Sequence, residues 1–470
     1  MSRSVTVNRN IVEMEYAVRG PIPQRAAQLA RQGRTIIPCN LGNPQALGQR
    51  PITFYREVLS LLESPARIER ERNLRALLNE DRSVVEGLAE HDCPSDYVLT
   101  LAERILSALG VGKMGGYTES KGPLFFRKAI AAYIDQRDDV ARTGGVRSDP
   151  EKIYMTNGAS EGARHVIEML VADERDGIMI PIPQYPLYSA TVKKVGGVQV
   201  NYYPDEDAGW TLPKSALEDA FQTATRSGVK VKAIVAINPA NPTGAVLPEE
   251  SVMDVVDFAE ERELAIIADE VYQHNLYGET FVSFASVVGG RDIPLFSLHS
   301  TSKGFYGECG HRGGYLEVRN DPNVAGTDLR FTDVLLKQAS VSLCSNTPGQ
   351  VLTYLMVSPP PKGSEPHTRF VEEREAVLSD LYAKARMIRG AFSQMDGVEC
   401  FGRTGAMYLF PRLNVLPPGT NDFDYCMSLL ESTGICTVDG GGFGQREGTQ
   451  HLRIAFLPSK ELLTEVLPLW

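Results

Sequence analysis

A single lysine in an unusual setting is the clearest chemical signal in the sequence. Lys303 lies in the stretch SLHSTSKGFYGECGHRGGY (297–315), after an apolar run that predicts a buried strand and among small and hydroxylated residues. A lysine at such a place is most often an ordinary loop residue. A partly desolvated lysine amine can also be neutral, attack a carbonyl carbon and form a Schiff base. The residues of the other loops are needed to choose between these two interpretations.

Two further loops follow predicted strands and present side chains that can bind a polar ligand. Asp269 ends an apolar strand, where an unpaired carboxylate is costly, so we expect it to have a cationic partner. Tyr272 lies one helical turn further on and can reach the same ligand. Asn241 stands in the turn NPANPTG (238–244), whose two Asn-Pro pairs fix the backbone. A purely structural turn explains such residues as well, so each loop alone is a weak signal.

An anion site and an aromatic surface are the remaining signals. The segment NGAS (157–160) ends a strand and opens a predicted helix, whose first N–H groups favour an anion. The alternative is that Ser160 only caps this helix. Tyr185 lies between two prolines that fix its backbone, and its ring can either stack on a flat heterocycle or pack against a helix.

The five loops together supply the groups that pyridoxal phosphate needs. Lys303 offers an amine for the aldehyde, Asp269 a carboxylate for the pyridinium nitrogen, and Tyr185 a ring to stack on. Asn241 and Tyr272 offer donors to the phenolic oxygen. The expected phosphate cradle consists of Ala159, Ser160, Ser300, Ser302 and Arg312. Because the structural alternatives would have to coincide in all five loops, the sequence predicts a site for this cofactor and no metal site.

Alternating strands and helices are predicted to position these loops. Helices are expected at 160–172, 213–227 and 248–263, between seven short apolar strands at 153–156, 177–180, 198–203, 232–237, 264–269, 294–298 and 314–318. This alternation is typical of an α/β fold with a mostly parallel seven-stranded sheet covered on both faces. Ligands bind such sheets at the carboxyl ends of the strands, where the candidate residues fall.

A second, smaller α+β domain is predicted from the two ends of the chain. We expect an N-terminal arm (1–35) that packs on a neighbouring subunit, and residues 20–23 (GPIP) should end any helix that begins before them. The small domain would comprise 36–110, with covering helices at 54–79 and 97–109, and 346–470. The latter part is expected to hold helices 368–395 and 422–433 and strands 407–413 and 452–456. The large cofactor-binding domain would span 111–345.

Composition excludes several classes of protein. The net charge of −11, without clusters of Lys and Arg, argues against a nucleic-acid binder. No apolar run approaches the roughly 20 residues that span a bilayer, so a soluble protein is expected. The seven cysteines show no zinc-like spacing and predict free thiols in a reducing, cytoplasmic compartment. Arginines near the N-terminus resemble a mitochondrial targeting segment, but Glu13 and Glu15 do not fit that pattern, so mitochondrial import is the alternative.

Over almost its whole length the sequence resembles the class I/II aminotransferases, which have fold type I and use pyridoxal phosphate. The motifs that carry the resemblance occur in the order GGYTESKGP, NGAS, PQYPLY, NPANPTG, ADEVYQ, HSTSKGFYGECGHRGG and HLRIAF. Further details, NLGNPQALGQRPITF, PIPQYPLYSA and ECGHRGGY, are similar to the alanine aminotransferase subfamily. The loop between Lys303 and Arg312 is one residue longer than in aspartate aminotransferases, which fits the alanine branch.

The resemblance implies roles for individual residues and a homodimer with active sites shared between subunits. Lys303 would bind the cofactor as a Schiff base and carry the proton, while Asp269 would pair with the ring nitrogen and Tyr185 would stack on the ring. Tyr117 would reach the phosphate in the neighbouring subunit. Arg453 would bind the substrate α-carboxylate with two parallel hydrogen bonds; the resemblance adds Gly42 and Asn241 to this substrate site.

The implied reaction is a ping-pong transamination, most readily L-alanine with 2-oxoglutarate giving pyruvate and L-glutamate. A glutamate:glyoxylate aminotransferase is the alternative within the family. A lyase similar to aminocyclopropane-carboxylate synthase shares the lysine, aspartate and arginine, but its substrate is a sulfonium compound. A cofactor-binding transcriptional regulator would need an N-terminal helix-turn-helix and a basic surface, and the sequence predicts neither. The choice of amino donor and acceptor is not fixed by these motifs.

Overall fold

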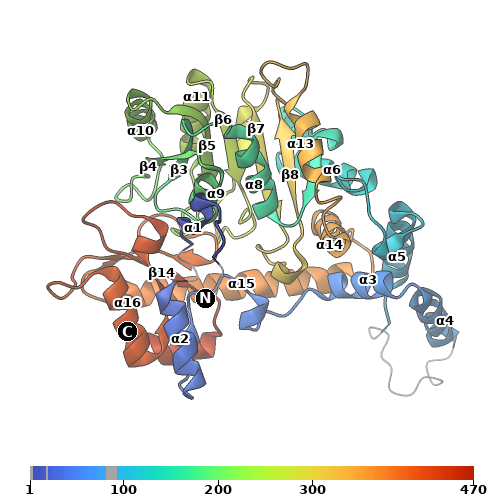
Figure 1. The fold of residues 1–470 in the computed structure, drawn as a ribbon. Helices are drawn as coiled ribbons and strands as arrows, with labels where there is room; N and C mark the ends of the chain where they lie inside the picture. The colour runs from blue at the N-terminus through green and yellow to red at the C-terminus, as the bar shows by residue number, and fades with distance from the viewer. Residues whose placement is uncertain (1–3, 17–19, 81–92) are drawn as a thin grey trace.

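The computed structural model describes residues 4–16, 20–80 and 93–470, and its centre is a sheet of seven strands (Figure 1). The sheet order is β2-β8-β7-β6-β5-β3-β4, and only β8 runs antiparallel to its neighbours. The strands are β2 (Ile153–Thr156), β3 (Asp176–Pro181), β4 (Val198–Tyr202), β5 (Lys230–Ile237), β6 (Ala265–Asp269), β7 (Leu295–Ser300) and β8 (Gly314–Arg319). The predicted seven-stranded, mostly parallel sheet is confirmed.

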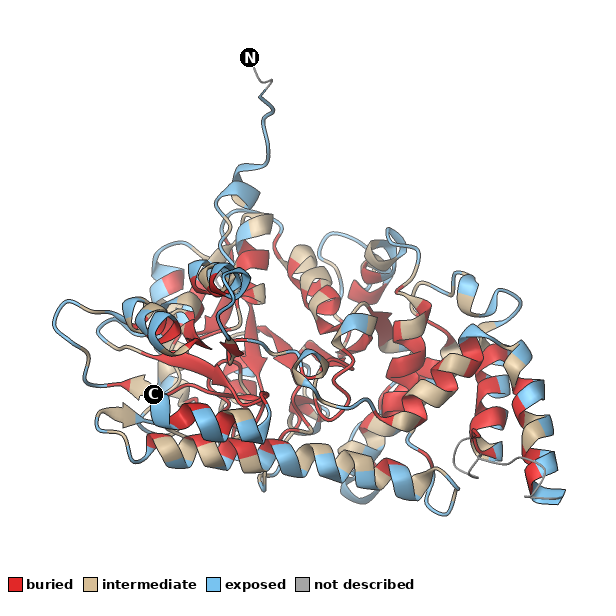
Figure 2. Cartoon of the chain, turned by 90° about the horizontal axis from the view of Figure 1, so that it is seen from below, coloured by how far each residue is buried: buried red, intermediate tan, exposed pale blue. Residues whose placement is uncertain are grey.

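Helices cover both faces of the sheet because alternate side chains of the strands point to opposite sides. In β6, Ile267 belongs to the apolar cluster under α8 (Ala159–Leu170) and α9 (Leu187–Val195), where α13 (Phe331–Ser340) also packs. Its neighbour Ile266 belongs to the cluster under α10 (Lys214–Arg226), α11 (Glu249–Glu261) and α12 (Phe284–Val288). Figure 2 shows the buried strands enclosed by helices with exposed outer faces.

A third apolar cluster lies beside β2. It joins α3 (Thr53–Glu63) and α5 (Asp96–Leu109) to α6 (Leu124–Arg137) and α14 (Thr347–Val357), and Ile153 and Met155 of the central sheet belong to it. The neighbouring α4 (Ala66–Glu80) packs on α5. The helices predicted at 54–79 and 97–109 therefore share a core with the central sheet. The domain boundaries at 35, 110 and 345 stay predictions.

The two ends of the chain meet in one smaller body below the sheet (Figure 1), where β1 (Ile37–Pro38) pairs in parallel with β12 (Ile435–Cys436). The long α15 (His367–Phe392) runs beneath the sheet into this body. Its other elements are β9 (Val398–Glu399), β10 (Tyr408–Leu409), β11 (Arg412–Leu413), α16 (Asp422–Thr433), β13 (Val438–Asp439), β14 (Leu452–Ala455) and α17 (Lys460–Val466). A smaller α+β body built from both ends of the chain is therefore present, as the fold class predicted.

The N-terminal segment contains two helices, one on each side of Gly20. Helix α2 (Pro21–Arg31) begins at Pro21, because a proline in the first turn loses no hydrogen bond that the helix needs. It packs on α16, with Arg25 2.9 Å from Glu431. The short α1 (Arg9–Val12) lies against α9, and α7 (Val140–Thr143) follows α6. None of the helices in the described part of the chain combines the length and apolarity that a membrane span requires.

Candidate active site

One edge of the sheet gathers most of the predicted site residues. In the order of the strands, this edge carries Arg312 before β8, Lys303 after β7, Asp269 at the end of β6, Asn241 after β5 and Tyr185 after β3. The antiparallel β8 begins where β7 ends, which brings Arg312 to this edge. Neighbouring strands lie about 4.8 Å apart, so the backbones carrying Arg312 and Asp269 are about 10 Å apart, with Lys303 between them.

The amine of Lys303 is held by a residue of the smaller body, across the site from the sheet edge. Its Nζ donates a hydrogen bond of 2.9 Å to the carbonyl of Gly42, which follows β1. Burial lowers the pKa of Lys303, but the Tyr408 phenol and the Cys309 thiol raise it, and the net shift is upward. The weakly acidic groups around the amine thus favour its charged form.

Asp269 is a buried carboxylate, 6% exposed. It accepts hydrogen bonds from the Tyr188 hydroxyl at 2.7 Å and from the Val271 N–H at 3.4 Å. Burial raises the pKa of Asp269, and these two hydrogen bonds and the charge of Lys303 oppose the shift. No residue in the described ranges forms an ion pair with it. The expected cationic partner is thus absent from the chain's own described residues, and the carboxylate can serve a cationic group of a ligand.

The residues expected to bind the phosphate lie together around the start of α8. Arg312 Nη2 donates to Ser160 Oγ at 3.1 Å and to the Asn157 carbonyl at 3.0 Å. A Cβ on Gly158, whose φ is +77°, would lie 2.5 Å from Arg312 Nη2, so this position needs glycine. Ser300 Oγ lies 3.1 Å from the Oγ of Ser302 and donates to the carbonyl next to Arg312. Ala159 is the first residue of α8, and the first N–H groups of a helix favour an anion.

Arg453 is a buried cation on β14, 2% exposed. Its Nη1 donates to Asn241 Oδ1 at 3.0 Å and its Nη2 to the Asn40 carbonyl at 2.7 Å. The guanidinium stacks over the rings of Tyr408 and Phe443, 4.3 and 4.7 Å from their centres. Its Nε is buried without a hydrogen-bond partner, and no carboxylate of the described residues pairs with it. A buried guanidinium in this state suits a carboxylate ligand.

Tyr408 is a site residue that the sequence reasoning missed. It comes from β10 of the smaller body, and its hydroxyl lies 3.4 Å from that of Tyr272. A Cβ on Gly42 would lie 1.9 Å from the Tyr408 hydroxyl and 3.4 Å from Lys303 Nζ, so both groups meet beside this glycine. Burial alone would raise the pKa of Tyr408, yet Lys303 and Arg453 lower it overall. Its only sequence signal was its place in the strand predicted at 407–413.

The two remaining predicted residues have different surroundings. Tyr185 accepts a hydrogen bond of 2.8 Å from the Tyr16 hydroxyl, and the two rings meet edge to face at 6.3 Å. Tyr117 is 80% exposed. Its predicted role at a neighbouring subunit's phosphate is therefore untested by this single chain. Tyr188, the hydroxyl donor to Asp269, was also missed, although it lies in the quoted motif PQYPLY.

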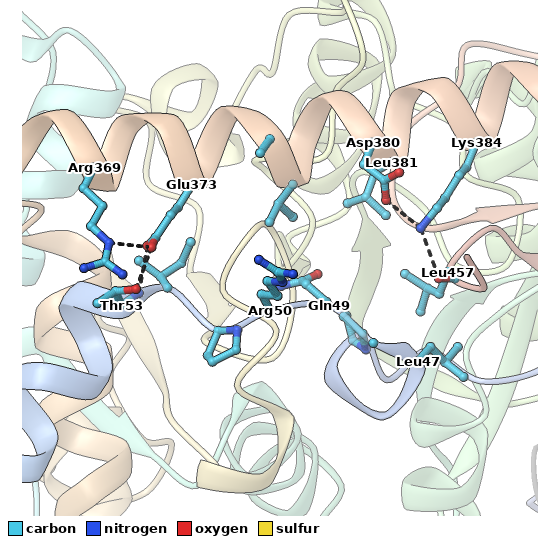
Figure 3. A pocket seen from close by; sticks show the side chains of 16 residues that line it. Leu47, Gln49, Arg50, Thr53, Arg369, Glu373, Asp380, Leu381, Lys384 and Leu457 are labelled. Carbon is cyan, nitrogen blue, oxygen red and sulfur yellow. Dashed lines mark hydrogen bonds and ion pairs between the residues drawn. The ribbon is translucent and has the colours of Figure 1, made fainter. Parts of the chain in front are cut away.

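A cavity of about 590 Å³ lies behind the loop that carries Gly42 (Figure 3). It separates residues 44–53 from α15. Its charged groups are satisfied at both ends: Glu373 accepts from Thr53, and Lys384 donates to the Leu457 carbonyl and lies 2.6 Å from Asp380. None of the predicted site residues lines it. The cavity is a gap behind the active-site loop, whereas the chemistry lies at the sheet edge.

The residues present fit pyridoxal phosphate. Three charged groups stand in a row: Arg312 with its hydroxyl neighbours for a phosphate, the Lys303 amine, and Asp269, whose buried carboxylate has no internal cation for its partner. This spacing and donor set match a flat pyridinium ring with a phosphate at one end. The described residues contain no group of three His, Cys, Asp or Glu side chains that could hold a metal ion.

Comparison with known proteins places this site in a family. Residues 84–467 match the family model of aminotransferase class I and II. Alanine aminotransferase 1 of Homo sapiens is 41% identical, over 98% of this chain and 92% of its own length. Alanine aminotransferase 2 of Panicum miliaceum is 39% identical, over 98% and 95%. Glutamate–glyoxylate aminotransferase 2 of Arabidopsis thaliana is 38% identical, over 98% and 93%.

Solved structures support the fold. The alanine aminotransferase from Pyrococcus furiosus superposes with a TM-score of 0.76 at 24% identity, and the aspartate aminotransferase from Thermotoga maritima with 0.70 at 21%. Each comparison covers 98% of both chains. At these identities the likeness concerns the fold alone, which is that of fold type I. From its sequence match, its fold and its site, the chain belongs to the class I and II aminotransferases.

Proposed function

We propose that the protein is an alanine aminotransferase that converts L-alanine and 2-oxoglutarate into pyruvate and L-glutamate by a ping-pong mechanism. The observation that carries the reaction type is the row formed by Arg312, Lys303 and Asp269 along one sheet edge, faced by the buried Arg453. The amino donor is inferred from relatives named alanine aminotransferase, which are about two-fifths identical over nearly the whole chain.

Each polar residue of the row has a defined task in this proposal. Asp269 holds the ring nitrogen, Arg312 and the serines beside it hold the phosphate, and Asn241 and Tyr272 face the phenolic oxygen. Tyr185 lies against the ring. When bound, pyridoxal phosphate supplies an electron sink for the negative charge that develops at the substrate Cα. Lys303 Nζ would take the proton from this carbon and pass it to the carbon that bore the cofactor's aldehyde. In the second half of the cycle it would move a proton in the opposite direction.

Arg453 anchors the substrate. Two of its nitrogens are fixed by Asn241 and by the Asn40 carbonyl, so the guanidinium cannot turn away from the site. Its unpaired Nε and a neighbouring Nη carry N–H groups on one edge of the guanidinium, which can bind both oxygens of an α-carboxylate in parallel. Gly42 leaves room for the substrate beside Lys303, because a side chain there would collide with Tyr408.

A homodimer with shared sites is part of the proposal. Four apolar side chains are at least half exposed to solvent: Val111, Tyr117, Val341 and Leu343. Their segments adjoin, since Ser120 Oγ and Ser340 Oγ are 3.0 Å apart. Exposed apolar groups that cluster on a surface favour association with another protein. A second copy of the chain would cover them and bring its own Tyr117 to the phosphate of this site. Sedimentation of the purified protein tests this point.

A glutamate:glyoxylate aminotransferase is the second candidate, because one relative of that name is nearly as similar as the alanine enzymes. The compartment is proposed to be the cytoplasm, supported by seven free cysteines. Relatives named mitochondrial make the mitochondrion the alternative. Cell fractionation followed by an activity assay in each fraction separates the two.

A half-reaction screen tests the function. The purified, cofactor-loaded protein is mixed with one amino acid at a time, and the absorbance change from the aldehyde to the amine form of the cofactor is recorded. We expect alanine and glutamate to cause it, and pyruvate to appear from alanine. If neither amino acid changes the spectrum, the assignment is wrong. Glyoxylate and 2-oxoglutarate are then compared as acceptors, and turnover of S-adenosylmethionine tests the lyase alternative.

A further inference from the structure

Asn275 is a fully buried residue that touches the segment of Lys303 and has no role in the reaction proposed above. It lies in the loop after β6, six residues beyond Asp269, and is 0% exposed. Its Oδ1 accepts a hydrogen bond of 2.9 Å from the N–H of Gly304, and its Nδ2 donates one of 3.3 Å to the carbonyl of the same residue. One side chain thus holds both polar backbone groups of the residue that follows Lys303.

The residue type suits this double contact. A carboxamide carries an acceptor oxygen and a donor nitrogen side by side, so one short side chain can bind a backbone N–H and a backbone carbonyl at the same time. Gly304 has a φ of +67°, and a Cβ there would lie 3.2 Å from the Tyr306 ring and 3.4 Å from His274. Glycine adopts positive and negative φ values about equally readily, so the positive φ of Gly304 is favoured only if another group stabilises it. The Asn275 amide provides that contact.

The backbone of Asn275 extends the connection to two other parts of the site. Its N–H donates to the Tyr272 carbonyl at 2.7 Å, and its carbonyl accepts from the N–H of Ala406 at 3.0 Å. Ala406 precedes Tyr408 by two residues. One buried residue thereby joins the loop of Tyr272, the segment of Lys303 and the strand of Tyr408, which are far apart in the sequence.

We propose that Asn275 is a positioning residue that fixes the backbone of Lys303, so that the amine reaches the reacting carbon. The proposal rests on the function above for its effect on turnover, but the contact with Gly304 is a property of the protein alone. An amine displaced by about 1 Å can slow a reaction about 100-fold, because proton transfer needs a defined distance and direction.

Asn320, which directly follows β8, provides a matched control. Its Nδ2 donates to the carbonyls of Arg291 and Ile293 at 2.7 and 2.9 Å, next to the beginning of β7. Lys303 follows the other end of this strand. Asn320→Ala therefore also removes two hydrogen bonds from a side-chain amide to the backbone, but far from the site. Both variants are expected to lose thermal stability.

The first measurement compares kcat and KM for alanine. We expect Asn275→Ala to lower kcat about 10- to 100-fold with KM changed less than about threefold, and Asn320→Ala to keep both values near those of the wild type. Asn275→Asp keeps the size and the acceptor and loses the donor, so kcat should lie between that of the wild type and that of Asn275→Ala. It also serves as the test variant if Asn275→Ala does not fold.

The second measurement follows hydrogen exchange of the peptide that contains Gly304, in the full chain. Losing the acceptor should speed exchange of the Gly304 N–H by roughly two- to tenfold in Asn275→Ala and leave it unchanged in Asn320→Ala. Unchanged kcat in both Asn275 variants, or a loss of kcat equal to that of Asn320→Ala, overturns the proposal. If the wild type does not act on alanine, the function above fails, and the exchange experiment still tests the contact.

Discussion

Two neighbouring carboxylates, Asp269 and Glu270, lie at the same strand end and have opposite surroundings. Both are buried, and burial raises the pKa of each, to about 7 for Glu270. Glu270 accepts from the Phe284 N–H at 2.8 Å and lies 3.6 Å from Arg137, which also pairs with Asp138. Asp269 has a phenol and a backbone N–H, but no arginine of its own.

The different surroundings indicate that Glu270 has a structural role and Asp269 a functional one. Alternate residues of a strand face opposite sides, so Glu270 turns into a network that is complete within the protein, while Asp269 turns toward the site. Arg453 resembles Asp269 in this respect, since it is buried and has no carboxylate partner among the described residues. A buried charge whose internal partners are incomplete indicates a ligand of opposite charge. The predictions below test this distinction, beginning with the largest effect.

Lys303→Ala should abolish turnover, with a loss of about 10⁴-fold or more, because the only amine at the reacting carbon is removed. Pyruvate formation from alanine in a coupled assay measures it. Lys230→Ala removes an exposed lysine at the start of β5 and should be fully active. Normal turnover in Lys303→Ala would end the assignment of this residue to the site.

Asp269→Asn and Glu270→Gln test the two carboxylates directly, because each replaces a charged group with a neutral one of the same shape. We expect Asp269→Asn to lower kcat by about 100-fold or more. The ring nitrogen loses an ionic hydrogen bond of about 1.5–3 kcal/mol, and without the carboxylate it also loses its proton. Glu270→Gln should keep kcat within about threefold. Equal effects in the two variants would contradict the division into functional and structural charge.

Arg453→Lys should raise KM for both alanine and 2-oxoglutarate, with kcat/KM lower by about 10- to 100-fold. A lysine keeps the charge but cannot form two parallel hydrogen bonds with a carboxylate. Initial rates with each substrate varied in turn provide the measurement. Arg412→Lys is the control, since Arg412 lies in the same small body and pairs with Glu206, Asp207 and Glu399 outside the site. An unchanged KM for both substrates would remove Arg453 from the carboxylate site.

The pH dependence of stability should differ between wild type and Glu270→Gln. The folded pKa of Glu270, about 7, is above its ordinary value of 4.5, so its favourable contribution is complete below pH 4.5 and is lost as the pH rises to about 7. This change corresponds to roughly 3 kcal/mol. Urea unfolding at several pH values should show that the free energy of unfolding of Glu270→Gln does not fall in this way between pH 4.5 and about 7. Glu250→Gln, at an exposed carboxylate, should follow the wild type.

Much of the fold was predictable from local patterns. All seven strands of the sheet were located from short apolar runs, and α16 lies at the predicted residues 422–433. Short apolar runs between polar helices indicate strands because a sheet covered on both faces has no solvent-exposed side. The start of α2 at Pro21 was not predicted, because the same proline that ends a helix is tolerated in the first turn of another.

The candidate site was predicted in part. The loops after the parallel strands were correctly expected at one edge, since parallel strands end together. Tyr188 and Tyr408 were missed because a buried tyrosine looks the same in a sequence whether its hydroxyl meets a carboxylate or only fills a core. Asn275 was missed because its hydrogen-bond partner, Gly304, is distant in the sequence.

The sequence by itself determined the types of group available: an amine, a carboxylate, an anion-binding helix start and a guanidinium, each placed next to a strand or helix end. Only the tertiary structure decided which of the two adjacent carboxylates faces the site, which tyrosines surround Lys303 and in which direction the pKa of its amine shifts. The physical reason is that charge states and hydrogen bonds depend on burial and on groups brought together from distant segments. Local sequence patterns contain neither quantity.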